Sequence, residues 1–564
     1  MEKNKSVKTI IILAVIAAVV FAAIFTVINL TQNANKTKNE ISAEKAMDRL
    51  EKLYKNIDIE TLDLQKSSVA LEADDGKDSL PDISKYPAQV EKTTEDFIEI
   101  FTSPEKAGKT YESWLIDVAN RFNSSGAKVN GKPVSVRIRN IASGLGVDYI
   151  STQKYVPDAF TPSNELWGEM LKAKGVTVTL TEKRLVGNVA GMLFSKDKNK
   201  AIIEKYGAVN LKNVNQAVIG NELSMGYTNP FASSSGLNFL VSTLSNFDSK
   251  NPLSDTAVGE FVKFQTNIPF VAYTTMQMRD SAQSGALDGF ILEYQSYVNT
   301  PEIKADYVFT PYGVRHDNPL YEIGNLSEIK KEIVKQFGAF CKTEQSQKLA
   351  SEYGFNNLDS YKYELPELDG EAITSAQKIW KEKKNGENDI AAVFVADTSG
   401  SMDGAPLNKL KESLLKGSKY IGKDNSIGLV TFSSDVKIAL PIAKFDINQR
   451  SFFTGAVQKM TANGGTAMFD GITVAIKMLM EEKQKNPNAK LMLFVLTDGE
   501  TNEGHSLNDT RDMIKGLKIP IYSIGYNANI SVLETVSKIN EAASINADTD
   551  DVVYKLENLF NAQM

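Results

Sequence analysis

Cysteine and histidine are nearly absent from this chain. Its 564 residues include one cysteine, Cys341, and two histidines, His316 and His505. A single thiol excludes an intramolecular disulfide and a cluster of thiolate metal ligands. Two histidines leave little material for histidine-based catalysis.

A large excess of charge of one sign is also lacking. The formal net charge is -7 over 564 residues, which is too mild to favour nucleic-acid binding through bulk electrostatics. The length exceeds what one hydrophobic core usually supports, so the chain has to contain several units. We expect two folded domains and one membrane anchor, and no nucleic-acid partner.

One long uncharged run lies near the N-terminus. Residues 10–28 are 19 residues without a charge, and Lys3, Lys5 and Lys8 precede them. The run is long enough to cross a bilayer as a helix, and the lysines favour a cytoplasmic N-terminus. We therefore predict a cytoplasmic tail over 1–8 and a transmembrane signal anchor over 9–30. The protein would be a single-pass protein of the cell membrane with its bulk outside the cell.

A cleaved signal peptide is the main alternative to this anchor. Its apolar core would usually be shorter and would end in small residues at a cleavage site, whereas this run is followed by Asn29, Leu30 and Thr31. A lipoprotein signal would need a cysteine just after the run, and the sequence has none there. Scarce cysteine also suits the exterior of a bacterium that makes few disulfides.

Two segments are interpreted as connections. Residues 31–92 are mostly polar and charged, which is typical of a linker that lifts the rest of the chain from the membrane. Within it, residues 43–53 look like a short solvent-exposed helix. Residues 364–387 lack a glycine-rich or proline-rich hinge and carry charged helical sequence, which indicates a fairly stiff connector.

Short apolar strands alternate with helical stretches over 93–363, which predicts an α/β domain built in layers. The phrases at 157–163, 229–237 and 346–355 resemble type II periplasmic solute-binding proteins. The resemblance implies a two-lobed domain, near the membrane, that holds a small anionic or polar solute. Glu293 ends an apolar strand candidate, where it would lie near the cleft or at a plain strand edge.

A serine-rich turn before a predicted helix is the best candidate for solute contact. Free backbone N–H groups at a helix N-terminus, with hydroxyls beside them, suit an anionic or polar group. The simpler alternative is that one serine only caps the helix. The candidate solute-binding residues are Ser143, Thr161, Ser163, Ser233, Ser234 and Ser235.

Three separated pieces carry the chemistry of the last third of the chain. Residues 397–402 read Asp-Thr-Ser-Gly-Ser-Met after an apolar run, 464–466 read Gly-Gly-Thr, and 496–499 read Leu-Thr-Asp-Gly after a second apolar run. Loops that leave buried strands would bring two acids, two serines and one threonine together at the carboxyl ends of those strands. An oxygen-only ligand set is what a hard ion such as Mg²⁺ prefers.

With these pieces in this order, residues 388–564 resemble a von Willebrand factor A (vWA) domain with an intact metal-ion-dependent adhesion site. The resemblance implies a doubly wound, Rossmann-like sheet and a bound Mg²⁺, or Mn²⁺ or Ca²⁺. It also implies a partner protein that supplies an aspartate or glutamate to the ion. The expected metal ligands are Asp397, Ser399, Ser401, Thr466 and Asp498.

Other acidic and histidine residues near this motif have plainer explanations. Asp403 and Glu500 flank the site and are interpreted as solvated rim residues, and His505 as a surface loop residue. No base, nucleophile or water-activating histidine belongs to the motif, so we expect recognition and not an enzyme. An enzyme would need an acid–base pair such as Asp158 with Glu165, whose spacing indicates only the start of a helix.

The sequence thus predicts a membrane-anchored extracellular binding protein, in which a solute-binding-like domain is joined to a metal-dependent adhesion domain. An alternative is a transport component whose first domain delivers a solute to a permease while the vWA domain holds the complex together. A third is a subunit of an ATPase. The predicted topology argues against that role, because such a motor needs cytoplasmic ATP.

Overall fold

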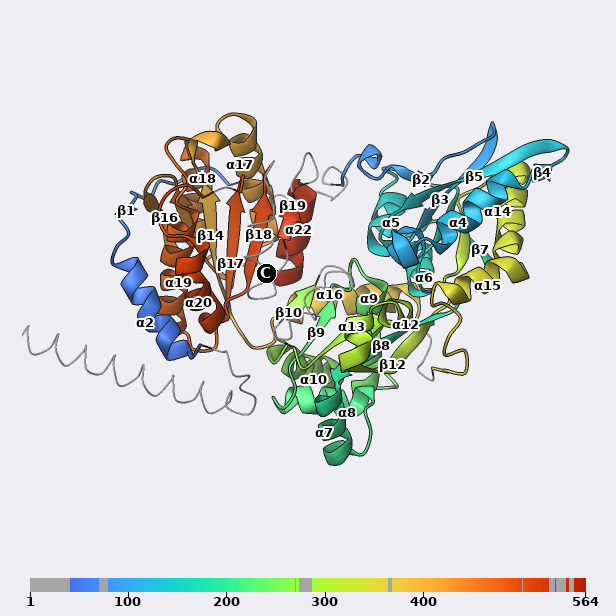
Figure 1. Ribbon diagram of the computed structural model, residues 1–564, viewed down its shortest axis with the longest axis horizontal. Coiled ribbons are helices and arrows are strands. Elements are labelled where there is room, and N and C mark those ends of the chain that lie inside the picture. The colour runs from blue at the N-terminus through green and yellow to red at the C-terminus, as the bar shows by residue number, and fades with distance from the viewer. Residues whose placement is uncertain are drawn as a thin grey trace, which may run out of the picture. The chain divides into compact units, whose positions relative to one another are not determined.

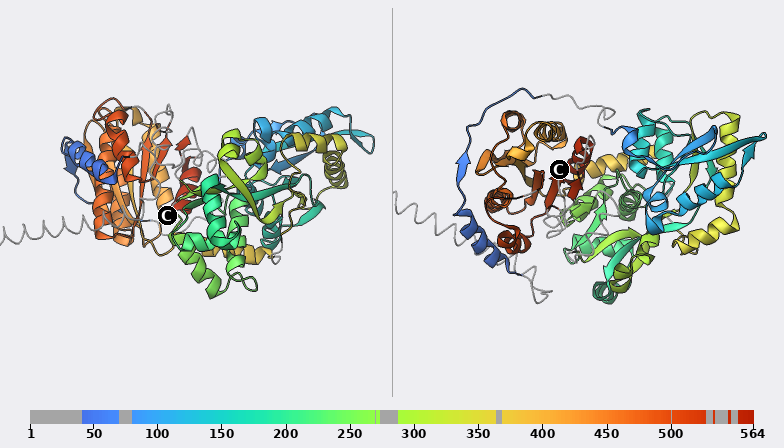
Figure 2. Two further views of the ribbon diagram at one scale, coloured as in Figure 1. Left: turned by 60° about the horizontal axis from the view of Figure 1, so that its bottom comes forward. Right: turned by 45° about the horizontal axis from the view of Figure 1, so that its top comes forward.

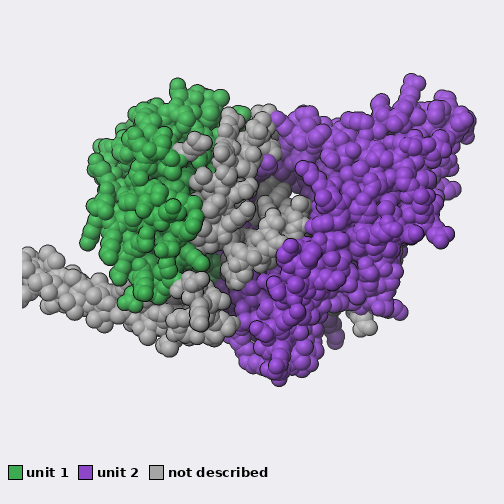
Figure 3. Space-filling view, in the orientation of Figure 1, with its two compact units in different colours: residues 1–71, 388–553 green, residues 72–387, 554–564 purple. Residues whose placement is uncertain are grey.

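The computed structural model describes residues 41–69, 80–268, 270–272, 287–363, 368–499, 501–526, 533, 544–546 and 552–564. The predicted tail and anchor, 1–30, lie outside the described residues. Within the described ranges, no helix combines the length and apolar character needed to cross a bilayer. The chain forms two compact units (Figures 1 and 3): unit 1 comprises residues 1–71 and 388–553, and unit 2 comprises 72–387 and 554–564.

Unit 1 is built on a seven-stranded sheet with the strand order β1-β16-β15-β14-β17-β18-β19. All eight residues of the central strand β14 are buried, as is usual for a parallel strand covered on both faces. Within this sheet β16 runs antiparallel to β15, while β14 is parallel to both β15 and β17. The strands are β1 (Ile59–Thr61), β14 (Ile390–Asp397), β15 (Ser426–Phe432), β16 (Val436–Lys444), β17 (Lys490–Thr497), β18 (Ile521–Gly525) and β19 (Ser544–Asn546).

Helices cover both faces of this sheet (Figures 1 and 2). On one face Val393 and Val395 of β14 share a buried cluster with side chains of α2, α19 and α20. On the other face the ring of Phe394 packs on Phe453 of α18 at 5.7 Å between centroids. The predicted doubly wound sheet is confirmed. The helices are α2 (Ala43–Tyr54), η3 (Gly400–Met402), α17 (Ala405–Gly417), η4 (Ser418–Tyr420), α18 (Ile447–Lys459), α19 (Met468–Lys485) and α20 (Leu507–Leu517).

Part of the expected polar linker belongs to unit 1. Helix α2 buries Ala46, Met47 and Leu50, and these residues form an apolar stripe because their spacing places them on one helix face. Strand β1 pairs in parallel with the edge strand β16, with Ile59 opposite Val436. The expectation of a solvent-exposed helix and a free spacer is therefore wrong over 43–61, where the chain extends the fold of unit 1.

Unit 2 contains two sheets, as expected for a two-lobed α/β domain. One has the order β2-β5-β3-β6-β13-β7, with β4 paired to β5, and the other the order β10-β9-β11-β8-β12. The strands of the first are β2 (Ala88–Val90), β3 (Asp96–Thr102), β4 (Lys128–Val129), β5 (Lys132–Asn140), β6 (Ala159–Thr161), β7 (Val178–Glu182) and β13 (Leu320–Ile323). Those of the second are β8 (Asn188–Ser195), β9 (Met225–Thr228), β10 (Phe270–Ala272), β11 (Gly289–Glu293) and β12 (Tyr307–His316).

Helices of unit 2 pack on these sheets and include the predicted connector. Helix α16 buries Ile373, Ala376 and Trp380, and the indole of Trp380 donates to the hydroxyl of Tyr227. Most of 368–387 is thus part of the fold of unit 2 and not only a spacer. The helices are η1 (Ile83–Lys85), α3 (Pro104–Ala107), η2 (Thr110–Glu112), α4 (Trp114–Ser124), α5 (Ser143–Ser151), α6 (Leu166–Ala173), α7 (Lys196–Tyr206), α8 (Leu211–Ile219), α9 (Ser234–Phe247), α10 (Asp255–Thr266), α12 (Tyr294–Val298), α13 (Pro301–Asp306), α14 (Glu328–Cys341), α15 (Glu344–Glu352), α16 (Gly370–Lys383) and α22 (Val552–Gln563).

Candidate functional site

The predicted metal ligands of unit 1 start from the ends of two neighbouring parallel strands. Asp397 is the last residue of β14, and Asp498 follows the last residue of β17. Because Ala396 pairs with Leu496 in the sheet, the two acids leave the same edge side by side. Asp397 is fully buried, whereas Asp498 is half-buried.

Two hydrogen bonds fix the carboxylate of Asp397. Its Oδ1 accepts from the backbone N–H of Ser399 at 2.8 Å, and its Oδ2 accepts from Thr497 Oγ1 at 2.5 Å. Burial raises the pKa of Asp397 above its ordinary value, the charge of Asp498 adds to that rise, and the two hydrogen bonds oppose it. The site therefore holds a carboxylate whose negative charge is favoured by a nearby cation.

The serine loop and the threonine loop are joined to each other. Ser399 Oγ and Ser401 Oγ lie 3.0 Å apart. The backbone N–H of Gly400 donates to the carbonyl of Gly464 at 3.0 Å, which brings the segment that carries Thr466 beside the serines. Gly464 has a φ of 72°, and a Cβ there would lie 2.9 Å from Ser434 Oγ, so this junction requires glycine.

Two oxygens at this edge have no protein partner. The Thr466 side chain is only 4 % exposed, and its backbone is fixed because its N–H donates to Asn502 Oδ1 at 2.8 Å and its carbonyl accepts from Thr501 Oγ1 at 2.8 Å. Among the described residues, nothing forms a hydrogen bond with the Thr466 hydroxyl or the Asp498 carboxylate. Neither oxygen is among the buried side-chain atoms that lack a partner, so both remain accessible to a ligand from outside.

The oxygens present fit a hard divalent cation. Carboxylates and hydroxyls are the ligand chemistry of Mg²⁺, and an ion there would satisfy both unpartnered oxygens. Over the part of the chain that the structure describes, no group of three or more histidine, cysteine, aspartate or glutamate side chains could hold a metal. At this site, the hydroxyls of Ser399, Ser401 and Thr466 would have to complement the two carboxylates.

The residues that flank the metal motif differ in their placement. His505 Nδ1 lies 2.5 Å from Asp470 Oδ1, and the backbone N–H of His505 donates to the same oxygen at 2.9 Å. His505 therefore fastens its loop to the first turn of α19 and is more than a plain surface residue. Asp403 is exposed, as expected of a rim residue, and Glu500 lies outside the described residues.

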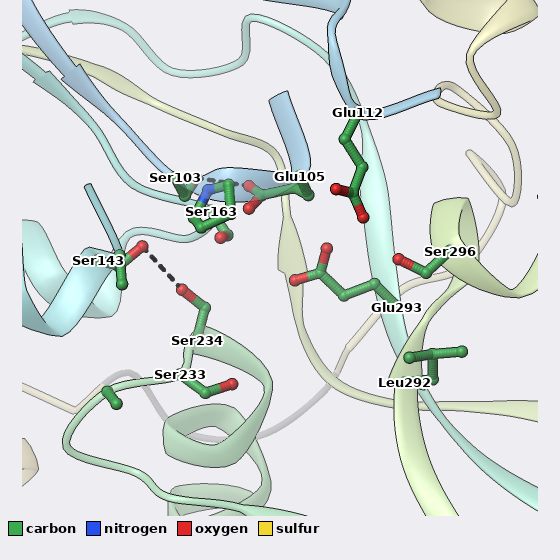
Figure 4. A pocket seen from close by; sticks show the side chains of 13 residues that line it. Ser103, Glu105, Glu112, Ser143, Ser163, Ser233, Ser234, Leu292, Glu293 and Ser296 are labelled. Atoms are coloured by element: carbon green, nitrogen blue, oxygen red, sulfur yellow. Dashed lines mark hydrogen bonds between the residues drawn. The ribbon is translucent and has the colours of Figure 1, made fainter. Parts of the chain in front are cut away.

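Unit 2 contains a polar pocket (Figure 4). Four of the six predicted solute-binding residues line it, and the other two, Thr161 and Ser235, are fully buried elsewhere. Ser235 Oγ donates to Glu293 Oε1 at 3.4 Å. The lining residues are Ser103, Pro104, Glu105, Glu112, Ala142, Ser143, Ser163, Ala232, Ser233, Ser234, Leu292, Glu293 and Ser296.

The serines on one side of the pocket form a short hydrogen-bonded group. Ser233 is the N-cap of α9, since its Oγ accepts from the backbone N–H of Gly236 at 3.3 Å. This serine therefore caps the helix, as the simpler alternative predicts. Ser234 Oγ accepts from the indole of Trp167 at 2.8 Å and donates to Ser143 Oγ at 3.1 Å. The pocket wall here consists of the beginnings of α5 and α9.

Three carboxylates line the pocket, and two of them belong to no recognisable sequence motif. Glu293 lies in the pocket, accepts from Asn188 Nδ2 at 2.9 Å and contacts His316 Nδ1 at 2.8 Å. Glu105 and Glu112 come from short helices before and after Gly108. The one local signal was a glutamate directly after Pro104 at a helix start.

Buried Lys106 lies behind this acidic wall. Its ammonium donates to Glu105 Oε1 at 2.9 Å, to Asn318 Oδ1 at 2.7 Å and to Ser103 Oγ. Burial lowers the pKa of Lys106. Burial alone would raise the pKa of Glu105, but the charge and hydrogen bonds of Lys106 and Ser103 outweigh it and leave that pKa below its ordinary value.

The pair of acids considered for catalysis does not meet in the pocket. Asp158 accepts from Lys330 Nζ at 2.6 Å and from the backbone N–H of Glu99 at 2.9 Å, which makes it a connection between elements. Neither Asp158 nor Glu165 is among the described residues that line the pocket.

Comparisons with known proteins find a different family in each of two stretches of the chain. Residues 392–563 match the family model of the von Willebrand factor type A domain, and residues 107–356 match that of a bacterial extracellular solute-binding protein. Inter-alpha-trypsin inhibitor heavy chain H3 of Bos taurus is 30 % identical over 176 residues, which are 28 % of this chain and 19 % of that protein. The chain thus spans about a fifth of the length of the curated relatives it matches.

Comparison with solved structures finds similarity to these two, among others. The sulfate-binding protein SubI from Mycobacterium tuberculosis H37Rv has 16 % identity and a TM-score of 0.35, with 47 % of this chain and 88 % of that chain covered. A von Willebrand factor type A protein from Catenulispora acidiphila has 19 % identity and a TM-score of 0.27, with 31 % and 42 % covered.

Proposed function

Since this chain combines a von Willebrand factor type A domain with a bacterial extracellular solute-binding domain, we propose that it is a membrane-anchored binding protein of the cell exterior. Its vWA domain uses a Mg²⁺ site to bind an acidic group of a partner protein, and its solute-binding domain holds a small ligand. The anchor is the uncharged run at 10–28, with the N-terminus in the cytoplasm.

The observation that supports the metal-dependent part is the pair of unpartnered oxygens beside a fixed carboxylate. Asp397 is oriented by two hydrogen bonds, while Thr466 and Asp498 offer oxygens that no described residue uses. Ser401 is exposed and Ser399 is buried, so the ligand set faces solvent on the Ser401 side. A partner can approach the site from that side.

Each side chain has a defined task at this site. Asp397 supplies negative charge, Ser399 and Ser401 supply neutral oxygens, and Thr466 adds one from the other loop. A bound Mg²⁺ would keep one position for an oxygen from outside, because neutral hydroxyls leave the ion electron-poor. A carboxylate of the partner protein fits that position.

We test metal-dependent capture with the full chain, tagged and solubilised from native membranes in mild detergent. Partners are collected in Mg²⁺, in EDTA, and with Ser399→Ala plus Ser401→Ala in Mg²⁺. We expect capture of the partner to fall at least about tenfold in EDTA and in the double variant, because each loss of a charge-assisted contact costs about a factor of ten or more.

The matched control removes two hydroxyls of the same unit. Ser418→Ala plus Ser426→Ala alters a 3-10 helix and the start of β15, away from the strand ends that carry the ligands, and should capture as well as the native chain. Equal capture of the same proteins in Mg²⁺, in EDTA and by the Ser399/Ser401 variant would overturn the metal-dependent role.

The proposal includes no catalysis. Under this proposal the side chains of the metal site act as oxygen ligands, held by the hydrogen bonds of Asp397 and the contact between Ser399 and Ser401. Mass spectrometry of the solute and of the captured partner after incubation with the Mg²⁺-loaded chain should show both unchanged. A new covalent product that depends on Thr466 or Asp397 would contradict this part.

The pocket of unit 2 supports a second candidate, in which the chain is the substrate-binding component of a transport system and the vWA domain is its assembly module. A pocket lined by six serines and three glutamates is suited to a polar solute. Under this alternative the metal-dependent partner is a permease, and deletion of the chain abolishes uptake of the bound solute. Unchanged uptake in the deletion strain would leave only the binding role.

A further inference from the structure

We propose that the pocket of unit 2 takes a small zwitterion, an α-amino acid, with its carboxylate toward the starts of α5 and α9 and its ammonium toward Glu105, Glu112 and Glu293. This inference rests on the proposed solute-binding role and names the class of solute. It narrows the anionic or polar ligand that the serine-rich turn predicts to one that carries both charges.

The acidic side of the pocket selects for a cation. Every titratable side chain among the described residues that line it is a glutamate: Glu105, Glu112 and Glu293. Figure 4 shows the carboxylates of Glu112 and Glu293 directed toward one another, while that of Glu105 points to Ser103, from which it accepts a hydrogen bond at 2.5 Å. Lys106 does not line the pocket and already donates to Glu105 and Asn318. An anion in this space would meet like charge at short range in a partly desolvated site, which is costly.

The opposite side selects for an anion. Helices α5 and α9 have nine and fourteen residues, and their first residues, Ser143 and Ser234, line the pocket. Over the described residues, the backbone N–H groups of Ser143 and Ser234 donate to no acceptor. Ser143 Oγ accepts from Ser234 Oγ, so its own proton remains available. Free N–H groups at helix starts bind carboxylates well.

An unpartnered hydroxyl between the two sides points independently to a ligand. Ser163 lines the pocket and the residue is only 3 % exposed. No described residue forms a hydrogen bond with its Oγ, and this oxygen is not among the buried side-chain atoms that lack a partner, so it remains accessible from the pocket. In Figure 4 it lies between the serine group and Glu105. A polar occupant of the pocket would be within reach of this hydroxyl.

Only a solute with both charges satisfies both sides. Sulfate would use the helix starts and be repelled by the glutamates, and a simple amine would leave the free N–H groups of Ser143 and Ser234 unused. The cavity volume of about 70 Å³ limits the occupant to a small solute, which fits the charged backbone group of an amino acid with its side chain in the open mouth.

The test is calorimetric titration of the full chain in detergent with each of the twenty common L-amino acids, and with acetate, methylammonium, sulfate and molybdate. We expect at least one amino acid to bind, and acetate and methylammonium to bind about 100-fold more weakly, since each makes one set of charged contacts. Tighter binding of sulfate or molybdate than of any amino acid would overturn the inference and leave the solute-binding role intact.

Two variants locate the binding. Glu112→Gln should weaken the amino acid about 10- to 100-fold by removing a charged partner, and Ser163→Ala should weaken it about fivefold by removing one neutral hydrogen bond. Glu204→Gln, an exposed glutamate of α7, removes the same charge outside the pocket and should not change the affinity. Equal affinity of Glu112→Gln and the native chain would contradict the orientation.

Failure of the inference and failure of the solute-binding role are distinguishable. If none of the amino acids and none of the four ions gives heat or a shift in unfolding temperature, the solute-binding role falls together with the inference. Variant melting curves without ligand separate loss of folding from loss of binding. Should Glu112→Gln fail to fold, the Ser163→Ala titration and the ligand series on the native chain still decide the question.

Discussion

At the scale of single residues, the Thr466 hydroxyl allows a test of whether this side chain is a metal ligand or only a structural residue. The residue is 4 % exposed, and no described residue forms a hydrogen bond with its hydroxyl. We predict that Thr466→Val lowers Mg²⁺ affinity about tenfold or more, while the metal-free unfolding free energy stays within about 1 kcal/mol of the native value, because no protein hydrogen bond is lost. Thermal unfolding with and without Mg²⁺ measures both.

The matched change for Thr466 is serine. Thr466→Ser keeps the oxygen and removes one methyl group, so it should retain most of the Mg²⁺-induced stabilisation. If valine and serine variants respond equally to Mg²⁺, the Thr466 hydroxyl is not a ligand, and the metal centre would have to rely on the other oxygens.

Asp509 gives a prediction on pH. Hydrogen bonds from Ser506, through its hydroxyl and its backbone N–H, hold the pKa of Asp509 below its ordinary value. A lowered folded-state pKa contributes stability that is present above the unfolded value and is lost as pH falls through the folded value. We predict that the unfolding temperature of the native chain exceeds that of Asp509→Asn at about pH 6, and that the gap closes toward about pH 3.

Asp512→Asn removes one charge from the same helix and serves as control for the Asp509 measurement. It leaves the reciprocal hydrogen bonds between Ser506 and Asp509 in place. A gap between the native chain and Asp509→Asn that stays constant from about pH 6 to about pH 3 would show that the Asp509 carboxylate does not stabilise the helix through its charge.

At the scale of elements, helix α2 tests whether the N-terminal segment belongs to unit 1. Leu50 is fully buried in the cluster that includes Val393 and Ile514. We predict that Leu50→Ala lowers the unfolding free energy of unit 1 by about 2–5 kcal/mol, the usual cost of a buried leucine truncation. Urea unfolding measures the change.

The control for Leu50→Ala lies on the same helix. Lys52 is exposed, so Lys52→Ala should change the unfolding free energy by less than about 0.5 kcal/mol. If Leu50→Ala is equally neutral, α2 does not contribute to the stability of unit 1 and acts as the spacer that the sequence indicates.

The elements that sequence predicted well are those with a strong local pattern. The apolar runs that form β14 and β17 are continuous, which is typical of parallel strands buried on both faces. The sequence predicts an exposed α2 because its core-facing residues, Ala46, Met47 and Leu50, are few among charged neighbours. Its burial depends on a partner surface of α20 and α19 that is more than 400 residues away in sequence.

The candidate metal site and the pocket also differ in how many of their residues a local sequence motif predicts. Asp397, Ser399 and Ser401 are neighbours in sequence after one strand, so a local motif predicts them. Whether they bind metal stays a prediction. Four of the six predicted pocket residues line the pocket, but Glu105 and Glu112 come from short helices without a motif. Only the folding of unit 2 brings them opposite the serines.

At the scale of the whole molecule, the two units should respond to different ligands. Each has its own buried clusters, with Val393 and Leu493 in unit 1 and Phe101 and Leu240 in unit 2. We predict two calorimetric transitions for the full chain. Mg²⁺ at about 100 times its Kd should stabilise one by about 2.7 kcal/mol and leave the other unchanged, while a solute of unit 2 does the reverse.

Two variants show which calorimetric transition belongs to which unit. Leu50→Ala should lower the transition that Mg²⁺ raises, and Ser163→Ala should leave that transition alone. A single cooperative transition that both ligands raise together would contradict independent units and would indicate that binding in one is felt by the other.

Because α2 and β1 pack in unit 1, only the residues between the proposed anchor and α2 remain as a tether. If the anchor ends at residue 30, about 12 residues lead to the first residue of α2, and a fully extended chain of that length reaches about 40 Å. With the proposed anchor, α2 would therefore begin no more than about 40 Å from the end of the membrane-spanning run.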